Sequence, residues 1–267
     1  MADADPAPSL SPEDADRAAV DSTKAPLIEH LTELRRRLLW SLAALGVAFF
    51  VCLYFARPIF AVLVQPLLAA GQGRLIYTQL FEAFFVEVKV ALFAAFMVAF
   101  PVIATQIWRF VAPGLYRNEK RAALPFLVAT PLLFGLGAAA AYYGAVPVAL
   151  KFLLGFEGNI GGVQQEALPA VGNYLDFIMN FMLAFGISFQ LPILLLLLER
   201  VGIVTLEQLR AGRRYAIVGA FAIAAVATPP DVVSQLLLAV PLCLLYESAL
   251  IVIAITRRRQ AKKATAA

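Results

Sequence analysis

Two glutamates that stand among arginines are the residues of this sequence best suited to binding chemistry. Glu33 precedes an arginine triplet in IEHLTELRRRLLW (28–40), and Glu119 lies in WRFVAPGLYRNEKR (108–121). A carboxylate binds a guanidinium through two parallel hydrogen bonds, so each glutamate could receive an arginine from another molecule. Each could instead pair with a base of its own segment, as Glu33 could at a helical spacing of three or four residues, for roughly 0.2–0.5 kcal/mol. The spacing leaves both interpretations open.

The histidine and cysteine content argues against a metal site or an enzyme. His30 is the only histidine, which removes every two-histidine metal site and the partner set that histidine-based catalysis needs. Cys52 and Cys243 lie in apolar runs without Cys-x-x-Cys spacing, as small packing residues do. We therefore expect no metal, no cofactor, no catalytic residue and no nucleic-acid partner.

The composition places the chain in a membrane. Its 267 residues are 61% hydrophobic and 15% charged, whereas soluble domains are roughly 45–50% apolar and about 25% charged. The apolar residues form blocks long enough to cross a hydrocarbon core of about 30 Å, which takes roughly 20 helical residues. They do not alternate with a period of two, as the strands of a membrane barrel do. The fold class is therefore all-α, that of a polytopic membrane protein.

Six apolar segments predict six transmembrane helices. The fifth is short, since about 14 residues span only about 21 Å, and the turn TPPD (228–231) joins it tightly to the sixth. A re-entrant hairpin or two fused spans remain open there. The segments are Leu38–Ala56, Phe84–Trp108, Ala122–Leu150, Tyr174–Leu198, Tyr215–Thr228 and Val232–Ile255.

Proline recurs inside or beside these segments, so we expect kinked helices and a curved bundle. The two larger connections on the outer side, 57–83 and 151–173, contain stretches such as PIFAVLVQPLL that predict short interfacial helices. The prolines in question are Pro101, Pro125, Pro131, Pro147, Pro192 and Pro241.

Lysine and arginine are concentrated in alternate connections. They crowd the region before the first segment, the connections between segments two and three and between four and five, and the C-terminal end. The opposite connections hold only Arg57, Arg74 and Lys151. The positive-inside rule then places both termini in the cytoplasm, which requires an even number of spans.

The two ends of the chain are expected to be tails. Residues 1–26 are rich in Ala, Pro, Ser and acids, a composition typical of a disordered cytoplasmic tail. Because this acidic stretch precedes the arginines, we expect the first apolar segment to be a retained anchor rather than a signal peptide, which needs a short basic start. We therefore predict a six-helix transmembrane domain at 27–256 and a basic cytoplasmic tail at 257–267.

Few polar side chains lie within the apolar segments. Glu247 is well inside the last segment and needs a partner or water. Gln190 precedes Pro192, a proline that frees a backbone carbonyl one turn earlier. The Gln190 amide could satisfy that carbonyl, bridge two helices or form a polar patch for a partner. Gln235 is a further amide of this kind.

Five stretches, in order along the chain, resemble the TatC family, the multi-spanning receptor subunit of the twin-arginine protein translocase. The resemblance implies a concave six-helix bundle in the cytoplasmic (inner) membrane that binds twin-arginine signal peptides and self-associates in membrane lipid. With small single-span partners of the TatA/TatB type, it implies export of folded proteins driven by the proton motive force. The stretches are PLIEHLTELRRRL (26–38), APGLYRNEKR (112–121), FGISFQLP (185–192), VGI with LRAGRRY (201–215) and TPPDVVSQ (228–235).

The resemblance also implies roles for single residues. Pro66, in the first outer loop, matches a position on which function depends, and many relatives carry glutamate at Gln190. Because an amide cannot titrate, a proton-carrying role does not transfer to Gln190. The positions that match signal-peptide recognition are Glu33, Arg35, Phe110 and Glu119, and the polar positions for the concave face or partner contact are Gln190, Asp231, Gln235 and Glu247.

We therefore expect a translocase receptor that is not an enzyme. The alternative is a secondary transporter or permease in which Glu247, Gln190 and Gln235 line a small-solute site, although the sequence has no internal repeat. An intramembrane enzyme is disfavoured because the sequence has no His-Glu-x-x-His motif and no histidine to serve a serine within a span.

Overall fold

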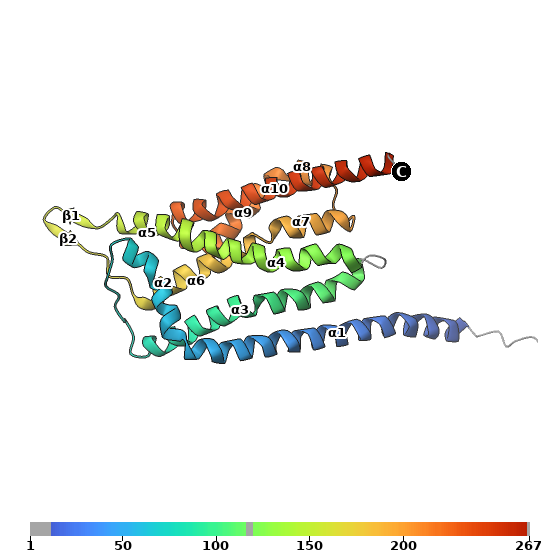
Figure 1. The fold of residues 1–267 in the computed structure, drawn as a ribbon, viewed down its shortest axis with the longest axis horizontal. Helices are drawn as coiled ribbons and strands as arrows, with labels where there is room; N and C mark the ends of the chain where they lie inside the picture. Colours follow the sequence, from blue (N-terminus) through green and yellow to red (C-terminus); the bar gives the residue numbers. More distant parts are fainter. Residues whose placement is uncertain (1–11, 116–119, 266–267) are drawn as a thin grey trace, which may run out of the picture.

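A computed structural model describes residues 12–115 and 120–265 as a bundle of long helices with one small hairpin (Figure 1). A five-residue π-helical stretch, η1 (Ala141–Ala145), joins α4 to α5, and the antiparallel strands β1 (Gly158–Ile160) and β2 (Val163–Gln165) form the hairpin. The α-helices are α1 (Pro12–Tyr54), α2 (Ala56–Ala69), α3 (Glu82–Leu115), α4 (Lys120–Ala140), α5 (Val146–Leu154), α6 (Val171–Ser188), α7 (Leu191–Arg200), α8 (Leu206–Ala211), α9 (Arg213–Ala227) and α10 (Val232–Thr265).

Five helical stretches among the described residues are long and apolar enough to cross a membrane. The predicted all-α fold and the multi-pass membrane class are therefore confirmed. The fifth predicted segment forms α9, whose 15 residues reach only about 22 Å at 1.5 Å per residue, so the count of six spans and the orientation of the termini stay predictions. The five stretches are His30–Tyr54, Glu82–Phe110, Phe126–Leu154, Val171–Arg200 and Val232–Arg258.

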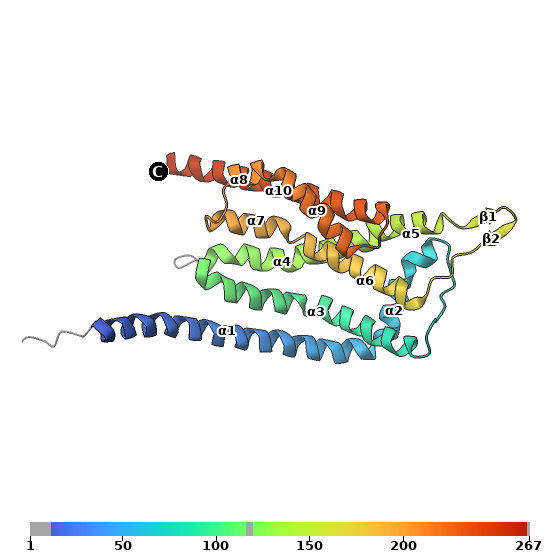
Figure 2. The same ribbon diagram turned by 180° about the vertical axis from the view of Figure 1, so that it is seen from behind.

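The bundle has two different ends (Figure 1 and Figure 2). At one end lie α2, the β1–β2 hairpin and the first turns of α3 and α6. At the other end lie the start of α1, the end of α3, the start of α4 and the end of α10. We call the second end the basic end, because the arginine-rich and lysine-rich connections belong to it, and the first the hairpin end.

The main core lies between α2, α3, α6 and α10. Val90 of α3, Phe181 of α6 and Leu238 of α10 are fully buried within it. The hydroxyl of Tyr174 in α6 donates to the carbonyl of Leu63 in α2 over 2.7 Å. The stretch predicted as an interfacial helix therefore forms α2, and this hydrogen bond holds α2 against α6.

Pro66, which the sequence places in the first outer loop, is a buried residue inside α2. Its carbonyl accepts a hydrogen bond from the backbone N–H of Ala70 (3.1 Å). Proline has no N–H to donate to the carbonyl four residues earlier, that of Val62, and the hydroxyl of Tyr142 donates to this carbonyl instead (2.6 Å).

α1 is the least embedded of the long helices. It packs along α3, where Cys52 meets the small residues Ala91, Ala94 and Ala95. Only 6% of its apolar stretch is buried. The position of α1 therefore depends on its seam with α3.

Helix extends into both stretches that the composition predicts as tails. α1 begins at Pro12 and α10 continues to Thr265, while residues 1–11 and 266–267 lie outside the described part. Alanines are frequent in the first part of α1, and helix propensity does not require an apolar run. The division of the chain into two tails and a transmembrane domain stays a prediction.

Two of the prolines expected to kink helices coincide with a change in helical geometry. Pro147 follows the π-helical η1, and Pro192 follows the break between α6 and α7. The missing N–H and the bulky ring of proline both disturb the preceding turn. Helices α3, α4 and α10 continue through Pro101, Pro125, Pro131 and Pro241.

Candidate functional site

Glu33 lies at the seam of α1 and α3 and is paired within the chain. The guanidinium of Arg37 donates to Glu33 Oε1 from Nη2 (2.8 Å) and from Nε (3.3 Å). From Nη1, Arg37 also donates to Oε1 of Gln106 on α3 (3.3 Å). The side chains stay partly accessible, 34% for Glu33 and 20% for Arg37. The spacing left open whether Glu33 binds an arginine of another molecule or a base of its own segment. In this structure Glu33 is paired with Arg37 of its own segment.

His30 extends the same seam. Its ring stacks on Phe110 of α3, with centroids 4.3 Å apart and an angle of 21° between the planes. Positions 30, 33 and 37 share one helical face, from which His30 and Arg37 contact α3. The sequence excludes His30 as a catalyst on the ground that it is the single histidine. Its spacing of three residues before Glu33 was the signal that the two side chains share a helical face.

Arg35 does not join this seam. It is exposed and lies two residues from Glu33, which is about 200° around the helix. Together with Arg36 and Trp40 it lines a shallow hollow of about 480 Å³ on that other face. Glu119 lies outside the described residues. Of the four positions predicted to recognise a signal, the structure brings together Glu33 and Phe110.

Gln190 bridges helices at the break between α6 and α7. Its Nε2 donates to the carbonyl of Thr130 on α4 (2.8 Å), which confirms the interpretation of this amide as a bridge. The Thr130 hydroxyl accepts from Trp108 Nε1 (2.7 Å) and donates to the Phe126 carbonyl (2.8 Å). Gln190 Oε1 is buried without a hydrogen-bond partner among the described residues. The amide lines a mainly apolar pocket of about 360 Å³.

Asp231 and Gln235 stabilise the turn between α9 and α10. Asp231 Oδ1 accepts the backbone N–H of Ser234 (2.7 Å) and so caps the first turn of α10. Gln235 Nε2 donates to the carbonyl of Phe221 on α9 (3.3 Å). Both polar positions therefore have a structural role within this turn.

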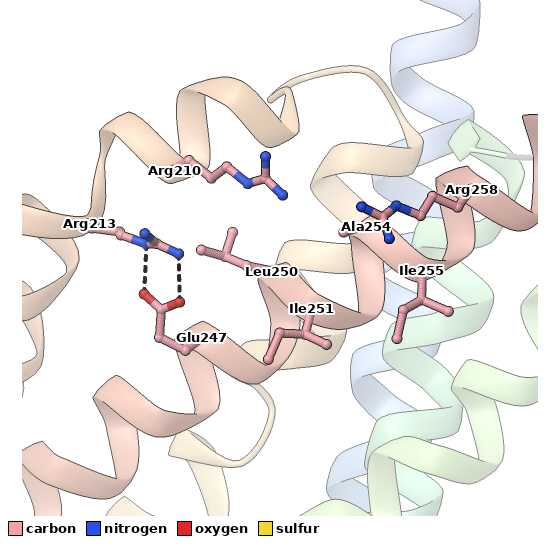
Figure 3. A pocket seen from close by; sticks show the side chains of 8 residues that line it. All are labelled: Arg210, Arg213, Glu247, Leu250, Ile251, Ala254, Ile255 and Arg258. Atoms are coloured by element: carbon pink, nitrogen blue, oxygen red, sulfur yellow. Dashed lines mark hydrogen bonds and ion pairs between the residues drawn. The ribbon is translucent and has the colours of Figure 1, made fainter.

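Glu247 finds its partner in Arg213, the first residue of α9 (Figure 3). The guanidinium makes two contacts of 2.8 Å, Nε with Oε1 and Nη2 with Oε2. Glu247 is 44% exposed. It contacts α9, Gln235 contacts α9 nearer the turn, and Gln190 contacts α4, so the structure does not bring these predicted polar positions into one cluster.

Two ion pairs between helices at the hairpin end were not predicted from the sequence. Lys89 of α3 bonds to both oxygens of Asp176 in α6 (2.8 and 2.9 Å). Arg57 Nε bonds to Glu87 Oε1 (3.1 Å). Lys89 lies seven residues into α3 and Asp176 five residues into α6, and both helices start at the hairpin end. The two depths differ by only two residues, so the sequence alone could have indicated this pair.

At the basic end, Arg257 of α10 joins two acids from different helices. It is bonded to Glu199 of α7 and lies 3.5 Å from Glu207 of α8. The pKa of the Glu207 carboxyl is below its usual range, first because of a hydrogen bond from its own backbone N–H and then because of Thr205, with Arg257 adding to the effect. This cluster fixes the last turns of α10 to the α7–α8 connection.

The described residues contain no group of three or more His, Cys, Asp or Glu side chains that could hold a metal ion. What they contain is a multi-pass helical bundle whose accessible charged groups gather at its two ends. The class is thus a polytopic helical membrane protein.

Within that class, this chain belongs to the TatC family. The family model, described as Sec-independent protein translocase protein (TatC), matches residues 29–241. The family is one of protein-translocation receptors rather than enzymes, and its members work in a Tat translocase together with other components. The predicted family and translocase function are confirmed, and the alternative of a small-solute permease gains no support.

Curated relatives and solved structures agree over most of the chain. The chain is 47% identical to TatC of Magnetococcus marinus over 226 residues, which is 84% of this chain and 82% of that protein. It is 42% identical to TatC of Aquifex aeolicus over 244 residues, 90% and 100% of the two chains. With TatC of Escherichia coli it shares 40% identity over 231 residues, 86% and 88% of the chains. A crystal structure of the twin arginine translocase receptor TatC matches with a TM-score of 0.75 at 42% identity, covering 85% of this chain and 98% of that one.

Proposed function

We propose that this chain is the signal-peptide receptor of a twin-arginine translocase and that the seam of α1 and α3 is its recognition site. A relative in the solved structures is described as a twin arginine translocase receptor. The observation that carries the site is the pair of Glu33 and Arg37: a carboxylate at the basic end already holds a guanidinium and stays partly open to water.

In this proposal an incoming arginine takes the place of Arg37. A partly exposed ion pair contributes only about 0–1 kcal/mol, so the exchange costs little. Arg37 keeps its hydrogen bond to Gln106 as a second anchor. The stacked rings of His30 and Phe110 stand beside the carboxylate and offer a flat surface on which a guanidinium can stack.

The second arginine of the signal needs a second carboxylate, and Glu119 is our proposal for it. α3 carries Gln106 and Phe110 into the seam and ends at Leu115, so Glu119 follows the recognition seam closely in the chain. Arg35, on the other face of α1, would in this arrangement contact the signal or the lipid surface rather than Glu33. The apolar part of the signal would lie along exposed apolar helix faces of the bundle.

The orientation follows from the same site. We propose that the basic end faces the cytoplasm, with both termini inside, and that the chain resides in the cytoplasmic (inner) membrane. The excess of Lys and Arg at this end supports that orientation. With TatA/TatB-type single-span proteins, and with further copies of itself, it would pass folded proteins outward using the proton motive force.

Site-specific photocrosslinking tests the recognition site. A photoreactive amino acid at Leu34, which is 43% exposed beside Glu33, is compared with the same probe at Tyr77, which is 57% exposed at the hairpin end. Each variant, in membrane vesicles, meets a precursor with paired arginines and the same precursor with paired lysines.

We expect crosslinks from Leu34 to the arginine precursor alone and their loss when Glu33→Gln and Glu119→Gln are combined. Equal crosslinking of both precursors, or crosslinks that survive the double substitution unchanged, would show that this seam does not read the arginines.

A further inference from the structure

Three arginines surround a pocket at the basic end, on the side of the bundle formed by α8, α9 and α10 (Figure 3). Arg210 comes from α8, Arg213 from the start of α9 and Arg258 from α10, and the pocket has a volume of about 200 Å³. Figure 3 shows the guanidinium groups of Arg210 and Arg258 reaching toward the same opening from two sides. No residue of the recognition seam lines this pocket.

The backbone that carries Arg210 is held firmly in place. A capping box starts α8, in which the Thr205 hydroxyl accepts the backbone N–H of Gln208 and the Gln208 side chain accepts the backbone N–H of Thr205. The Tyr246 hydroxyl of α10 donates to the carbonyl of Leu209 (2.6 Å), and Leu209 itself is buried. The side chain of Arg210 therefore extends from a fixed point over α10.

The pocket carries more positive than negative charge. Glu247 is its single acidic lining residue, and it is already engaged by Arg213 through two contacts of 2.8 Å. The salt bridges between described residues include neither Arg210 nor Arg258. Glu207, on the same helix as Arg210, is 3.5 Å from Arg257. Two guanidinium groups thus face the opening without a carboxylate at salt-bridge distance within the described chain.

The floor of the pocket is apolar and belongs to one face of α10. Leu250 is buried, whereas Ile251 and Ile255 are 58% and 46% exposed. The apolar stretch of α10 that could cross a membrane ends at Arg258. The cationic groups therefore lie at the boundary of the apolar stretch, directly beside exposed isoleucines that continue into it.

We propose that this pocket binds the phosphodiester headgroup of an anionic phospholipid, with an acyl chain lying along Ile251 and Ile255. Guanidinium groups bind phosphate oxygens in bidentate geometry, and basic pockets between helices at the cytoplasmic side bind anionic headgroups. Free phosphate would use the arginines but not the isoleucines. An acidic polypeptide segment would likewise leave the exposed apolar floor uncovered.

Glu247 has a defined part in this site. It orients Arg213 toward the pocket wall and neutralises one of the three positive charges. The site is also separate from the recognition seam, because α1 and α10 form opposite sides of the bundle in both views (Figure 1 and Figure 2). Lipid binding can therefore be tested without reference to signal binding.

Native mass spectrometry of the purified full-length chain tests the proposal. The protein is released from detergent micelles that contain equal amounts of phosphatidylglycerol and phosphatidylcholine, and retained lipid is counted over a concentration series. We expect selective retention of phosphatidylglycerol. The double substitution Arg210→Gln and Arg258→Gln should weaken it roughly thirtyfold, since each basic residue near an anionic surface contributes about fivefold.

Two further variants separate specific binding from damage to the fold. Arg74→Gln with Lys151→Gln removes two exposed positive charges at the hairpin end and should leave retention unchanged. Glu247→Gln releases Arg213 from its partner and should strengthen retention about fivefold. A variant that only disturbs the fold would not gain retention of phosphatidylglycerol selectively over phosphatidylcholine.

Two competitors distinguish the sources of the anion. Millimolar inorganic phosphate and a poly-glutamate peptide are each added before release, and neither should displace the lipid. The proposal is overturned if the arginine double variant retains phosphatidylglycerol like the unaltered chain. It is also overturned if phosphate displaces the lipid completely, or if poly-glutamate binds with the same dependence on Arg210 and Arg258.

Discussion

The ring of His30 lies 4.3 Å from the ring of Phe110, centroid to centroid, and this stack ties the start of the apolar part of α1 to the end of α3. The hydrogen bond from Arg37 to Gln106 is the second tie between the same helices. Because only 6% of the apolar stretch of α1 is buried, these contacts decide where Glu33 is presented. The proposed recognition chemistry and the docking of α1 therefore involve the same few side chains.

Substitution of Glu33 should weaken signal binding, whereas substitution of Arg37 should not. Glu33→Gln removes the charge that an arginine of the signal would meet, and hydrogen bonds to charged groups contribute about 1.5–3 kcal/mol. We expect binding of a twin-arginine signal peptide to weaken about 10- to 100-fold. Arg37→Gln frees the carboxylate from its internal partner, so binding should be equal or tighter. Fluorescence anisotropy with a labelled peptide measures both.

The fold should tolerate both of these changes. The pair is partly exposed, and such pairs contribute at most about 1 kcal/mol. Thermal unfolding of each variant in detergent is the control. If Arg37→Gln weakens binding as much as Glu33→Gln does, Arg37 is part of the receptor surface and is not displaced by the signal.

An aromatic ring at position 30 should be enough to hold α1 against α3. His30→Phe keeps an aromatic ring at the seam, so signal binding and the protection of α1 should persist. His30→Ala removes the ring, and we expect faster backbone hydrogen exchange over residues 28–40. Hydrogen exchange with mass spectrometry on the two variants gives the comparison. Equal protection in both would mean that the stack does not hold α1.

Much of the fold can be read from the sequence because burial in a membrane has a simple signature. The apolar blocks predict α3, α10 and the composite helix of α6 and α7, and the proline at Pro192 predicts the break between the latter two. The stretch PIFAVLVQPLL predicts α2. These features depend on local composition and on single-residue stereochemistry.

The partners of polar side chains were harder to predict, since they depend on how helices rotate against one another. Glu247 is 34 residues from Arg213 in the chain, and no local pattern connects them. Gln190 bonds to a backbone carbonyl, that of Thr130, and a carbonyl acceptor is not encoded by residue type. The sequence therefore predicts the polar positions but not the helix that each one contacts, and their place on one concave face stays a prediction.

The bridge from Gln190 should contribute less stability than the threonine it reaches. Gln190→Leu loses one hydrogen bond but also removes the unpaired Oε1, so the free energy of unfolding should change by less than about 1 kcal/mol. Thr130→Val leaves the buried Trp108 Nε1 without its acceptor, which costs about 1–3 kcal/mol. Unfolding in a denaturing detergent series measures both. A larger loss for Gln190→Leu would reverse this ranking.

The crossing of α4 and α6 should be the place least tolerant of a single added methyl group. A Cβ built at Gly186 would lie 2.6 Å from Cε2 of Phe134, and Phe134 is stacked on Phe100 at 3.7 Å between centroids. The ring has little room to move, so we expect Gly186→Ala to lower the free energy of unfolding by about 1–3 kcal/mol. Gly135→Ala is the matched control, because a Cβ there meets nothing within 4 Å and helix propensity favours alanine by up to about 1 kcal/mol.

A double-mutant cycle identifies the cause of that loss. If the clash with Phe134 is responsible, Gly186→Ala should cost clearly less in a Phe134→Leu background, where the ring is absent, and the two substitutions should be non-additive. Additive effects would place the strain elsewhere. Gly186 lies four residues before Gln190, so the same crossing sets the position of the bridge to Thr130. Relief of the clash should therefore restore both stability and the protection of the α6–α7 break in hydrogen exchange.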